Sequence, residues 1–381
     1  MNLFIIHQFP DLDNLAPIIN TLSTKKKVLI LCIYPVYEFK KYKILRFLLK
    51  HNISYLSILS ISPIFKLFEI FLKILFLLPN FIVSKLDFLW RYIYYNNFVF
   101  NRKTFDNINT KQNISTINID DALPQKYKKI ISVYAKEKKI PLYLFKNGVE
   151  MRRYNKNEFE YFVECDKIII QDNHHKVEQN NLINNKIIKS CHRYSKQWLD
   201  YSEGAYDIKM KDFPSLKSET SRKTRVVMFT TNSAKDRWDE IFNLISDIKN
   251  TDVKLIKKPR GILKPLHLQE NNNIKFTSSE LINWADIIVS HASSILIEAA
   301  IKNKKILFLE YLSLSGEDLI VNDYNFFEKI HSDNQLISAI KNFKFEKQNN
   351  FLSKEFFLSK VLGKSYANNN YLENLIDKLY N

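Results

Sequence analysis

Glycine is scarce in this chain, with five glycines among 381 residues. The sequence contains no Gly-x-Gly-x-x-Gly motif and no Gly-x-x-x-x-Gly-Lys-Ser/Thr motif. Those motifs depend on glycine because the backbone must approach a phosphate closely. Their absence argues against a dinucleotide-dependent oxidoreductase and against a P-loop kinase. A Gly-x-Ser-x-Gly nucleophile elbow and a His-Glu-x-x-His zinc motif are missing as well.

Cysteine is equally rare, and the three cysteines follow no ligand or redox spacing: Cys32, Cys165 and Cys191. They indicate a reducing compartment, no disulfide framework and no metal site. An export signal is also lacking. The first nine residues are apolar, but they have no basic start and lead directly into Pro10. We therefore expect a cytoplasmic protein whose first residues form a core strand.

Apolar and basic residues, in contrast, are abundant. Hydrophobic residues make up 46% of the chain and aromatic residues 14%, which is enough for packed cores, and the length suits two domains. Lys and Arg number 57 against 40 Asp and Glu, a net charge of +17. This balance suits an anionic partner such as a nucleotide-activated donor or a membrane surface. Because the basic residues are dispersed and no aromatic RNA-binding motif occurs, we expect no nucleic acid partner.

Short runs rich in Ile and Leu alternate with helical patterns along the chain. This order predicts an α/β fold with parallel, doubly wound sheets whose strands are buried on both faces. The expected strands are 3–6, 28–33, 53–59, 114–119, 142–145, 168–170, 226–229, 253–256, 274–276, 287–289 and 306–309. The expected helices are 11–22, 238–249, 279–284, 295–302 and 334–343.

A polar, weakly periodic segment divides these strands into two groups. We predict two Rossmann-like domains that face each other across a cleft, residues 1–185 on the acceptor side and 225–353 on the donor side, with a linker at 186–224. The helical tail, 354–381, is expected to cross back to the first domain.

The most apolar region, 64–90, contains several charged residues and Pro79, so we expect that it does not span a bilayer. Its charges recur at helical spacing, which favours a pair of helices packed on the sheet. The alternative is an interfacial helix that rests on the cytoplasmic face of the inner membrane.

Polar residues cluster directly after four of the expected strands, at 146–150, 230–236, 257–261 and 290–294. All four clusters lie at carboxyl ends of strands, the edge where ligands bind to open parallel sheets. The last cluster precedes the expected helix 295–302. Ser293 and Ser294 therefore either cap that helix or, with its free N–H groups, bind a phosphate.

Four segments carry a resemblance to a known family. They are the basic loop KKPRG at 257–261, the strand ADIIVS at 285–290, the helix start with Ser293, Ser294 and Glu298, and SCHRYSKQW at 190–198. In these segments the chain resembles the donor-binding domain of GT-B glycosyltransferases of bacterial surface polysaccharide synthesis. That group includes capsule β-Kdo transferases and CDP-glycerol glycerophosphotransferases.

The resemblance implies a metal-independent transferase that needs no cofactor. Its substrate is expected to be a nucleotide-sugar donor, with a CMP-linked sugar as the first candidate. Hydroxyls and basic groups can hold the departing phosphate. Glu298 either accepts hydrogen bonds from ribose hydroxyls or is an ordinary helix glutamate. The expected donor-binding residues are Thr231, Asn232, Lys257, Arg260, Ser290, His291, Ser293, Ser294 and Glu298.

The reaction also needs a carboxylate, and Glu150 and Asp236 are the candidates, one from each side of the cleft. Such a group acts as a base on the acceptor or as a nucleophile in a retaining double displacement. The resemblance implies retaining transfer of Kdo from CMP-Kdo to a capsule, lipopolysaccharide or other lipid-linked glycan. Two alternatives remain open: a CDP-glycerol-type phosphotransferase, and a non-catalytic basic module that binds anionic polymer or membrane.

Overall fold

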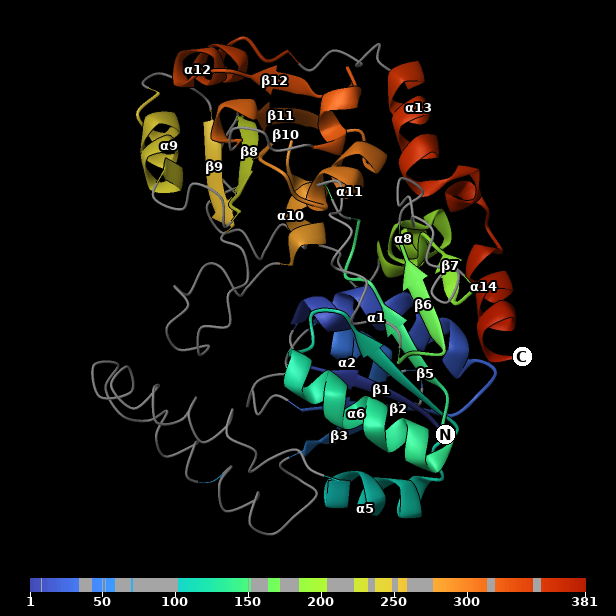
Figure 1. The fold of residues 1–381 in the computed structure, drawn as a ribbon. Helices are drawn as coiled ribbons and strands as arrows, with labels where there is room; N and C mark the ends of the chain where they lie inside the picture. The colour runs from blue at the N-terminus through green and yellow to red at the C-terminus, as the bar shows by residue number, and fades with distance from the viewer. Residues whose placement is uncertain are drawn as a thin grey trace.

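The computed structural model describes residues 1–7, 9–33, 43–49, 51, 53–58, 70, 102–149, 151, 164–171, 185–203, 223–231, 237–248, 253–258, 277–313, 319–344 and 351–381. These residues form two α/β units, each built around a sheet in which all strands are parallel (Figure 1). The α/β class with two doubly wound sheets is therefore confirmed. The region at 64–90, apart from Ile70, and the expected strand at 274–276 lie outside the described residues.

The first sheet has seven strands in the order β3-β2-β1-β4-β5-β6-β7. The strands are β1 Asn2–Ile6, β2 Val28–Cys32, β3 Ser54–Ser57, β4 Thr116–Asp120, β5 Leu142–Phe145, β6 Lys167–Ile170 and β7 Ile187–Lys189. The helices are α1 Phe9–Ser23, α2 Lys43–Leu49, α5 Arg102–Gln112 and α6 Gln125–Lys138. One face of the sheet packs against α1 and α2 and the other against α5 and α6, which explains the uninterrupted burial of β1, β2 and β4.

The second sheet has five strands in the order β12-β11-β10-β8-β9. The strands are β8 Thr224–Phe229, β9 Val253–Lys258, β10 Ile287–Ser290, β11 Lys305–Leu309 and β12 Glu328–Ile330. One face is covered by α9 Arg237–Ser246 and α12 Asp333–Lys341. The other face is covered by α10 Ser278–Trp284, α11 Ile295–Ile301 and α13 Phe351–Leu362.

The segment that follows residue 185 continues the first sheet, because β7 pairs in parallel with β6. Two short helices come next, the 3-10 helix η4 His192–Tyr194 and α8 Lys196–Ser202. The last helix, α14 Tyr371–Tyr380, also packs on the first unit, against the core of α1 and α2. Figure 1 shows α13 beside the second unit and α14 beside the first, so the end of the chain spans both units.

The two units share hydrophobic contacts. Val149 and Met151, which follow β5 of the first sheet, are 3% and 4% exposed and belong to the core of the second unit. Tyr194 of η4 lies in the same core. The Ile320 N–H donates to the Met151 carbonyl oxygen at 2.9 Å, which adds a backbone link between the units.

Each sheet has one point where the chain reverses its direction of winding, between β1 and β4 in the first sheet and between β10 and β8 in the second. Ligands of open α/β sheets bind outside the carboxyl ends of the strands at such points. In the part of the chain that the structure describes, no helix is long and apolar enough to cross a membrane.

Candidate functional site

Ser290 is the last residue of strand β10 and His291 follows it, and both are completely buried. The Ser290 hydroxyl donates to the Phe229 carbonyl oxygen at 2.9 Å. The His291 Nε2 lies 3.0 Å from the Ser313 Oγ, and its ring stacks on Phe308 at 5.5 Å between centroids. Both side chains therefore fix the end of β10 against its neighbouring strands.

Ser293 and Ser294 stand at the start of α11 and are partly exposed. Ser294 occupies the N-cap position, but its hydroxyl accepts no capping hydrogen bond. The Ser293 hydroxyl is 3.5 Å from the Ile295 N–H, at the limit of a hydrogen bond. Helix capping therefore does not account for the Ser294 hydroxyl.

Gly148 brings the first unit to this helix start. Its φ of +75° is a backbone conformation that residues with a Cβ rarely adopt. A Cβ at this position would lie 3.2 Å from the Ser294 Oγ and 3.3 Å from the Tyr194 Oη. The loop after β5, the start of α11 and the end of η4 thus meet at Gly148.

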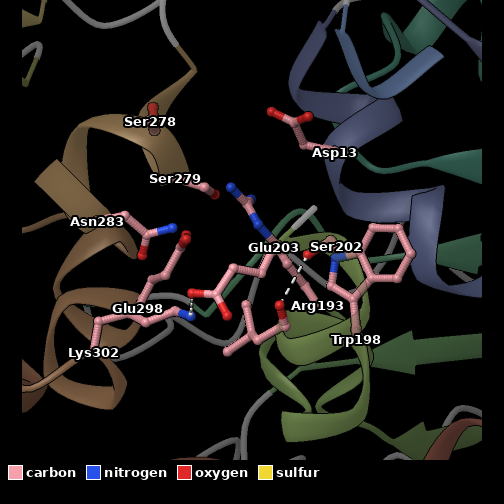
Figure 2. A pocket seen from close by; sticks show the side chains of 11 residues that line it. Asp13, Arg193, Trp198, Ser202, Glu203, Ser278, Ser279, Asn283, Glu298 and Lys302 are labelled. Carbon is pink, nitrogen blue, oxygen red and sulfur yellow. Dashed lines mark hydrogen bonds and ion pairs between the residues drawn. The ribbon is translucent and has the colours of Figure 1, made fainter. Parts of the chain in front are cut away.

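A narrow cavity of about 20 Å³ opens between the two units next to this meeting point (Figure 2). By volume it holds about one water molecule. The first unit contributes Asp13 of α1, Arg193 of η4 and residues of α8, and the second contributes residues of α10 and α11. Most of the lining side chains are polar or charged: Asp13, Arg193, Ser202, Glu203, Ser278, Ser279, Asn283, Glu298 and Lys302.

Glu298 lines this cavity and is 3% exposed. Burial raises the pKa of its carboxyl, and the Ser279 hydroxyl and the charges of Arg193 and Lys302 offset part of that rise. Lys302, one turn further along the chain, forms an ion pair with Glu203 of α8 at 3.3 Å, across the boundary between the units. Glu298 is thus a buried cleft residue rather than a glutamate on the outer surface of its helix.

Lys257 and Lys258 point to opposite faces of strand β9, because successive side chains of a strand alternate. Lys257 forms an ion pair with Asp239 of α9, and its ammonium lies 5.8 Å from the Phe242 ring centroid. Lys258 interacts electrostatically with Asp13 of the first unit and Glu280 of α10. Burial lowers the pKa of Lys258 to about 8, although these two carboxylates oppose the shift.

Thr231 follows β8 at the reversal point of the second sheet and is 8% exposed. Within the described residues, its buried hydroxyl has no hydrogen-bond partner. The remaining expected site residues lie outside the described residues: Glu150, Asn232, Asp236 and Arg260. Their proposed roles therefore stay predictions.

A buried polar network occupies the reversal point of the first sheet, and only its member Lys146 belongs to one of the expected polar clusters. The Asn14 amide donates to the Asp120 Oδ2 at 2.6 Å and to the Lys146 carbonyl oxygen at 3.1 Å. Burial, followed by the nearby charge of Asp11, raises the pKa of Asp120 well above its ordinary value. Gln171 joins the network through Asn14, and its Oε1 accepts from the Arg193 N–H at 3.3 Å.

Other residues of the meeting point could have been found from the sequence. Lys258 lies two residues after Ile256 and therefore on the same face of β9, and Ile256 faces the core that contains α10 and α11. Arg193 and Tyr194 both lie inside the 190–198 segment that carries part of the family resemblance. Asp13 carries no comparable signal, because only the packing of the two units brings it to the cavity.

Two doubly wound parallel units with a polar cavity between them define the GT-B fold. Solved structures agree with this class. The UDP-GlcNAc 2-epimerase from Methanocaldococcus jannaschii is 13% identical with a TM-score of 0.53, covering 100% of this chain and 99% of that one. The UDP-GlcNAc 2-epimerase from Neisseria meningitidis bound to UDP-GlcNAc is 14% identical with a TM-score of 0.54, covering 99% and 98%.

The wall teichoic acid polymerase TagF is also similar, at 10% identity and a TM-score of 0.56, covering 99% of this chain and 88% of that one. At these identities the likeness shows the fold. No protein-family model matches the chain, and no curated protein matches it.

Proposed function

We propose that this protein transfers a group from a nucleotide-activated donor and that it holds the donor phosphate where Gly148 faces Ser294. The observation that carries the proposal is this contact. A glycine with positive φ from one unit lies against a serine hydroxyl of the other unit that makes no capping hydrogen bond, beside a polar cavity. Hydroxyls, free N–H groups and a backbone without a side chain are the groups that let a protein approach a phosphate closely.

Positive charge for the departing nucleotide comes from Lys258 and Arg193. Arg193 lines the cavity, and Lys258 lies near Asp13, which also lines it. A phosphate that gains negative charge as its bond to the transferred group breaks is stabilised by such preorganised cations and donors. Glu298 is the proposed acceptor for ribose hydroxyls, since its carboxylate is buried at the same cavity.

The first donor that we propose is CMP-Kdo, with retention of configuration and with Asp236 or Glu150 as the catalytic carboxylate. For this donor, we propose that the site is completed by Thr231, Asn232 and Arg260. Ser290 and His291 support the site from within the sheet. The acceptor is a growing glycan or a lipid-linked glycan at the inner membrane surface. The similarity to TagF favours a second candidate, a CDP-glycerol-type phosphotransferase, in which the acceptor hydroxyl attacks phosphorus.

Release of free nucleotide from three donors distinguishes these candidates. The full-length protein is incubated with CMP-Kdo, CDP-glycerol or UDP-GlcNAc, with and without a glycan acceptor preparation. We expect acceptor-dependent release from one cytidine donor. A lack of binding and of release with every donor rules out the proposal. Binding that instead weakens steeply with salt for any polyanion indicates the non-catalytic basic module.

Serine substitutions test the site itself. The double variant Ser293→Ala/Ser294→Ala should weaken donor binding about 10-fold, because two hydroxyl donors to a phosphate are lost. It should retain nearly the stability of the unmodified protein, since Ser294 does not cap α11. Ser332→Ala is the matched control, because the Ser332 hydroxyl does cap α12 by accepting from the Gln335 N–H at 3.3 Å. That variant should lose about 1 kcal/mol of stability and keep its donor affinity.

A further inference from the structure

Tyr194 is a second feature of the meeting point that calls for a ligand. It ends helix η4 of the first unit, yet its ring packs in the hydrophobic core of the second unit and is 1% exposed. The same core contains Val149, Met151 and Ile295, which are apolar. A phenylalanine would fill the same space without bringing a hydroxyl into the core.

The Tyr194 hydroxyl is fully buried and has no hydrogen-bond partner in the part of the chain that the structure describes. A buried hydroxyl without a partner destabilises a protein, because the hydrogen bonds it makes to water in the unfolded chain are not replaced. Such groups are uncommon in native proteins and call for a specific explanation. Structural support of the core does not explain this one, since the ring alone supplies the packing.

The surroundings of the Tyr194 hydroxyl indicate which ligand would engage it. The Tyr194 Oη and the Ser294 Oγ lie 3.3 Å and 3.2 Å from the same point, the position of a Cβ on Gly148. The guanidinium carbon of Arg193 lies 5.7 Å from the centroid of the Tyr194 ring. Two hydroxyls that both lie against Gly148, with a guanidinium near the tyrosine ring, suit an anionic oxygen better than an apolar group.

We propose that the Tyr194 hydroxyl binds a phosphate oxygen of the nucleotide donor together with the Ser294 hydroxyl, and that this contact completes the site when the donor enters. This inference rests on the proposed function and adds to it a residue from the first unit. In the structure Gly148 lies against both hydroxyls, so entry of the phosphate requires the Gly148 backbone to move away from Ser294 and Tyr194.

The variant Tyr194→Phe removes the hydroxyl and keeps the ring. By calorimetry with CMP, CDP and UDP, we expect the Kd of the nucleotide that binds most tightly to rise about 10- to 100-fold. The melting temperature without nucleotide should stay constant or increase, because a buried hydroxyl without a partner has been removed. Tyr134→Phe is the matched control: Tyr134 is also buried, but it lies on α6 against Phe105, in the first unit. The nucleotide affinity of the Tyr134→Phe variant should equal that of the unmodified protein.

A double variant tests whether the two hydroxyls hold the same group. If Tyr194 and Ser294 bind one phosphate, Tyr194→Phe/Ser294→Ala should weaken binding by less than the product of the two single effects. An unchanged Kd in Tyr194→Phe, with binding by the unmodified protein intact, overturns this inference and leaves the proposed function standing. A decreased melting temperature with an unchanged Kd also overturns it and assigns the hydroxyl to the core. If the unmodified protein binds none of the three nucleotides, both proposals fail.

Discussion

Gly148 affects both the conformation of the loop after β5 and the contact between the two units. Its positive φ and its close approach to Ser294 and Tyr194 are independent reasons for glycine at this position. The first concerns the stability of the loop, and the second concerns the space between the two units. A substitution with alanine affects both, and a suitable control separates them.

We predict that Gly148→Ala lowers the free energy of unfolding by about 1 kcal/mol and weakens donor binding at least about 10-fold. The loss of stability follows from the φ of +75°, and the loss of binding follows from a methyl group 3.2 Å from the Ser294 Oγ. Gly363→Ala is the control, because Gly363 has a φ of +79° but ends α13. Gly363→Ala should lower the free energy of unfolding by a similar amount and leave donor affinity unchanged. Equal losses of affinity in the two variants would show that strain alone is responsible.

The buried histidines determine part of the response to acid. Burial lowers the pKa of His192 from 6.5 to about 3, and that of His7 from 6.5 to about 4. Below pH 6.5 the unfolded chain binds a proton at each histidine while the folded protein does not. Stability is therefore lost as the pH falls from 6.5 toward those values. Asp120 acts in the opposite direction, because its raised pKa makes the folded protein retain a proton that the unfolded chain releases.

Comparison with His192→Gln separates the contribution of His192 to the pH dependence of stability from the contribution of Asp120. Between pH 6.5 and pH 5, we expect the unmodified protein to lose about 1.5–2 kcal/mol more stability than His192→Gln. Urea unfolding at the two pH values, followed by tryptophan fluorescence, measures the difference. Parallel pH profiles for the two proteins would contradict a neutral, buried His192.

At the scale of elements, periodicity predicted the strands well because most strands of the two sheets are buried and apolar. The expected strand at 142–145 coincides with β5, and the strand at 287–289 differs from β10 by one residue. Strand β7 has no comparable pattern, because it has three residues and only Ile188 of them is buried. A strand so short resembles a loop, which is why no strand was predicted there, whereas β7 pairs with β6 and extends the first sheet.

The candidate site was harder to predict than the strands because it depends on which way each side chain points. Lys257 and Lys258 are adjacent and chemically identical, yet one contacts Asp239 and the other faces Asp13. Glu298 and Lys302 are separated by one helical turn, but only the packing of α8 against the cavity decides that both lie between the units. The Lys302–Glu203 contact joins residues 99 positions apart, beyond the reach of local patterns.

Helix α14 attaches the end of the chain to the first unit, and its contacts include one buried hydrogen bond between side chains. The Tyr380 hydroxyl donates to the Asn118 Oδ1 at 2.7 Å, and Asn118 is completely buried in β4. We predict that Tyr380→Phe lowers the free energy of unfolding by about 1–3 kcal/mol, because a buried carbonyl oxygen loses its donor. Urea denaturation measures the change.

Asp377→Asn on the same helix is the control. Asp377 forms an ion pair with Lys25 at 2.5 Å, but the two side chains are 48% and 41% exposed. Ion pairs at such exposure contribute about 0–1 kcal/mol. Neither variant should change nucleotide affinity, because neither Tyr380 nor Asp377 lines the cavity between the units. A larger effect at Asp377 than at Tyr380 would contradict this account.

For the whole molecule, the two units are joined both by a common core and by polar contacts around the cavity. Val149 and Met151 extend from the first unit into the second core and form a fixed connection. The Lys302–Glu203 ion pair lies across the cavity, where one partner is 60% exposed and the attraction is weak. Relative motion of the units is therefore expected to open the cavity side while the apolar connection stays in place.

A cavity of about 20 Å³ is too small for a nucleotide, so donor entry requires that motion. We predict that a short bis-maleimide link between Glu203→Cys and Lys302→Cys weakens nucleotide binding at least about 10-fold. The three native cysteines do not interfere, since all are buried. The Glu203→Cys and Lys302→Cys single variants, each treated with N-ethylmaleimide, are the controls, and the cross-linked protein should bind nucleotide at least about 10-fold more weakly than either. Full affinity in the cross-linked protein would show that the donor does not enter between the units, which would move the proposed phosphate site away from Gly148 and Ser294.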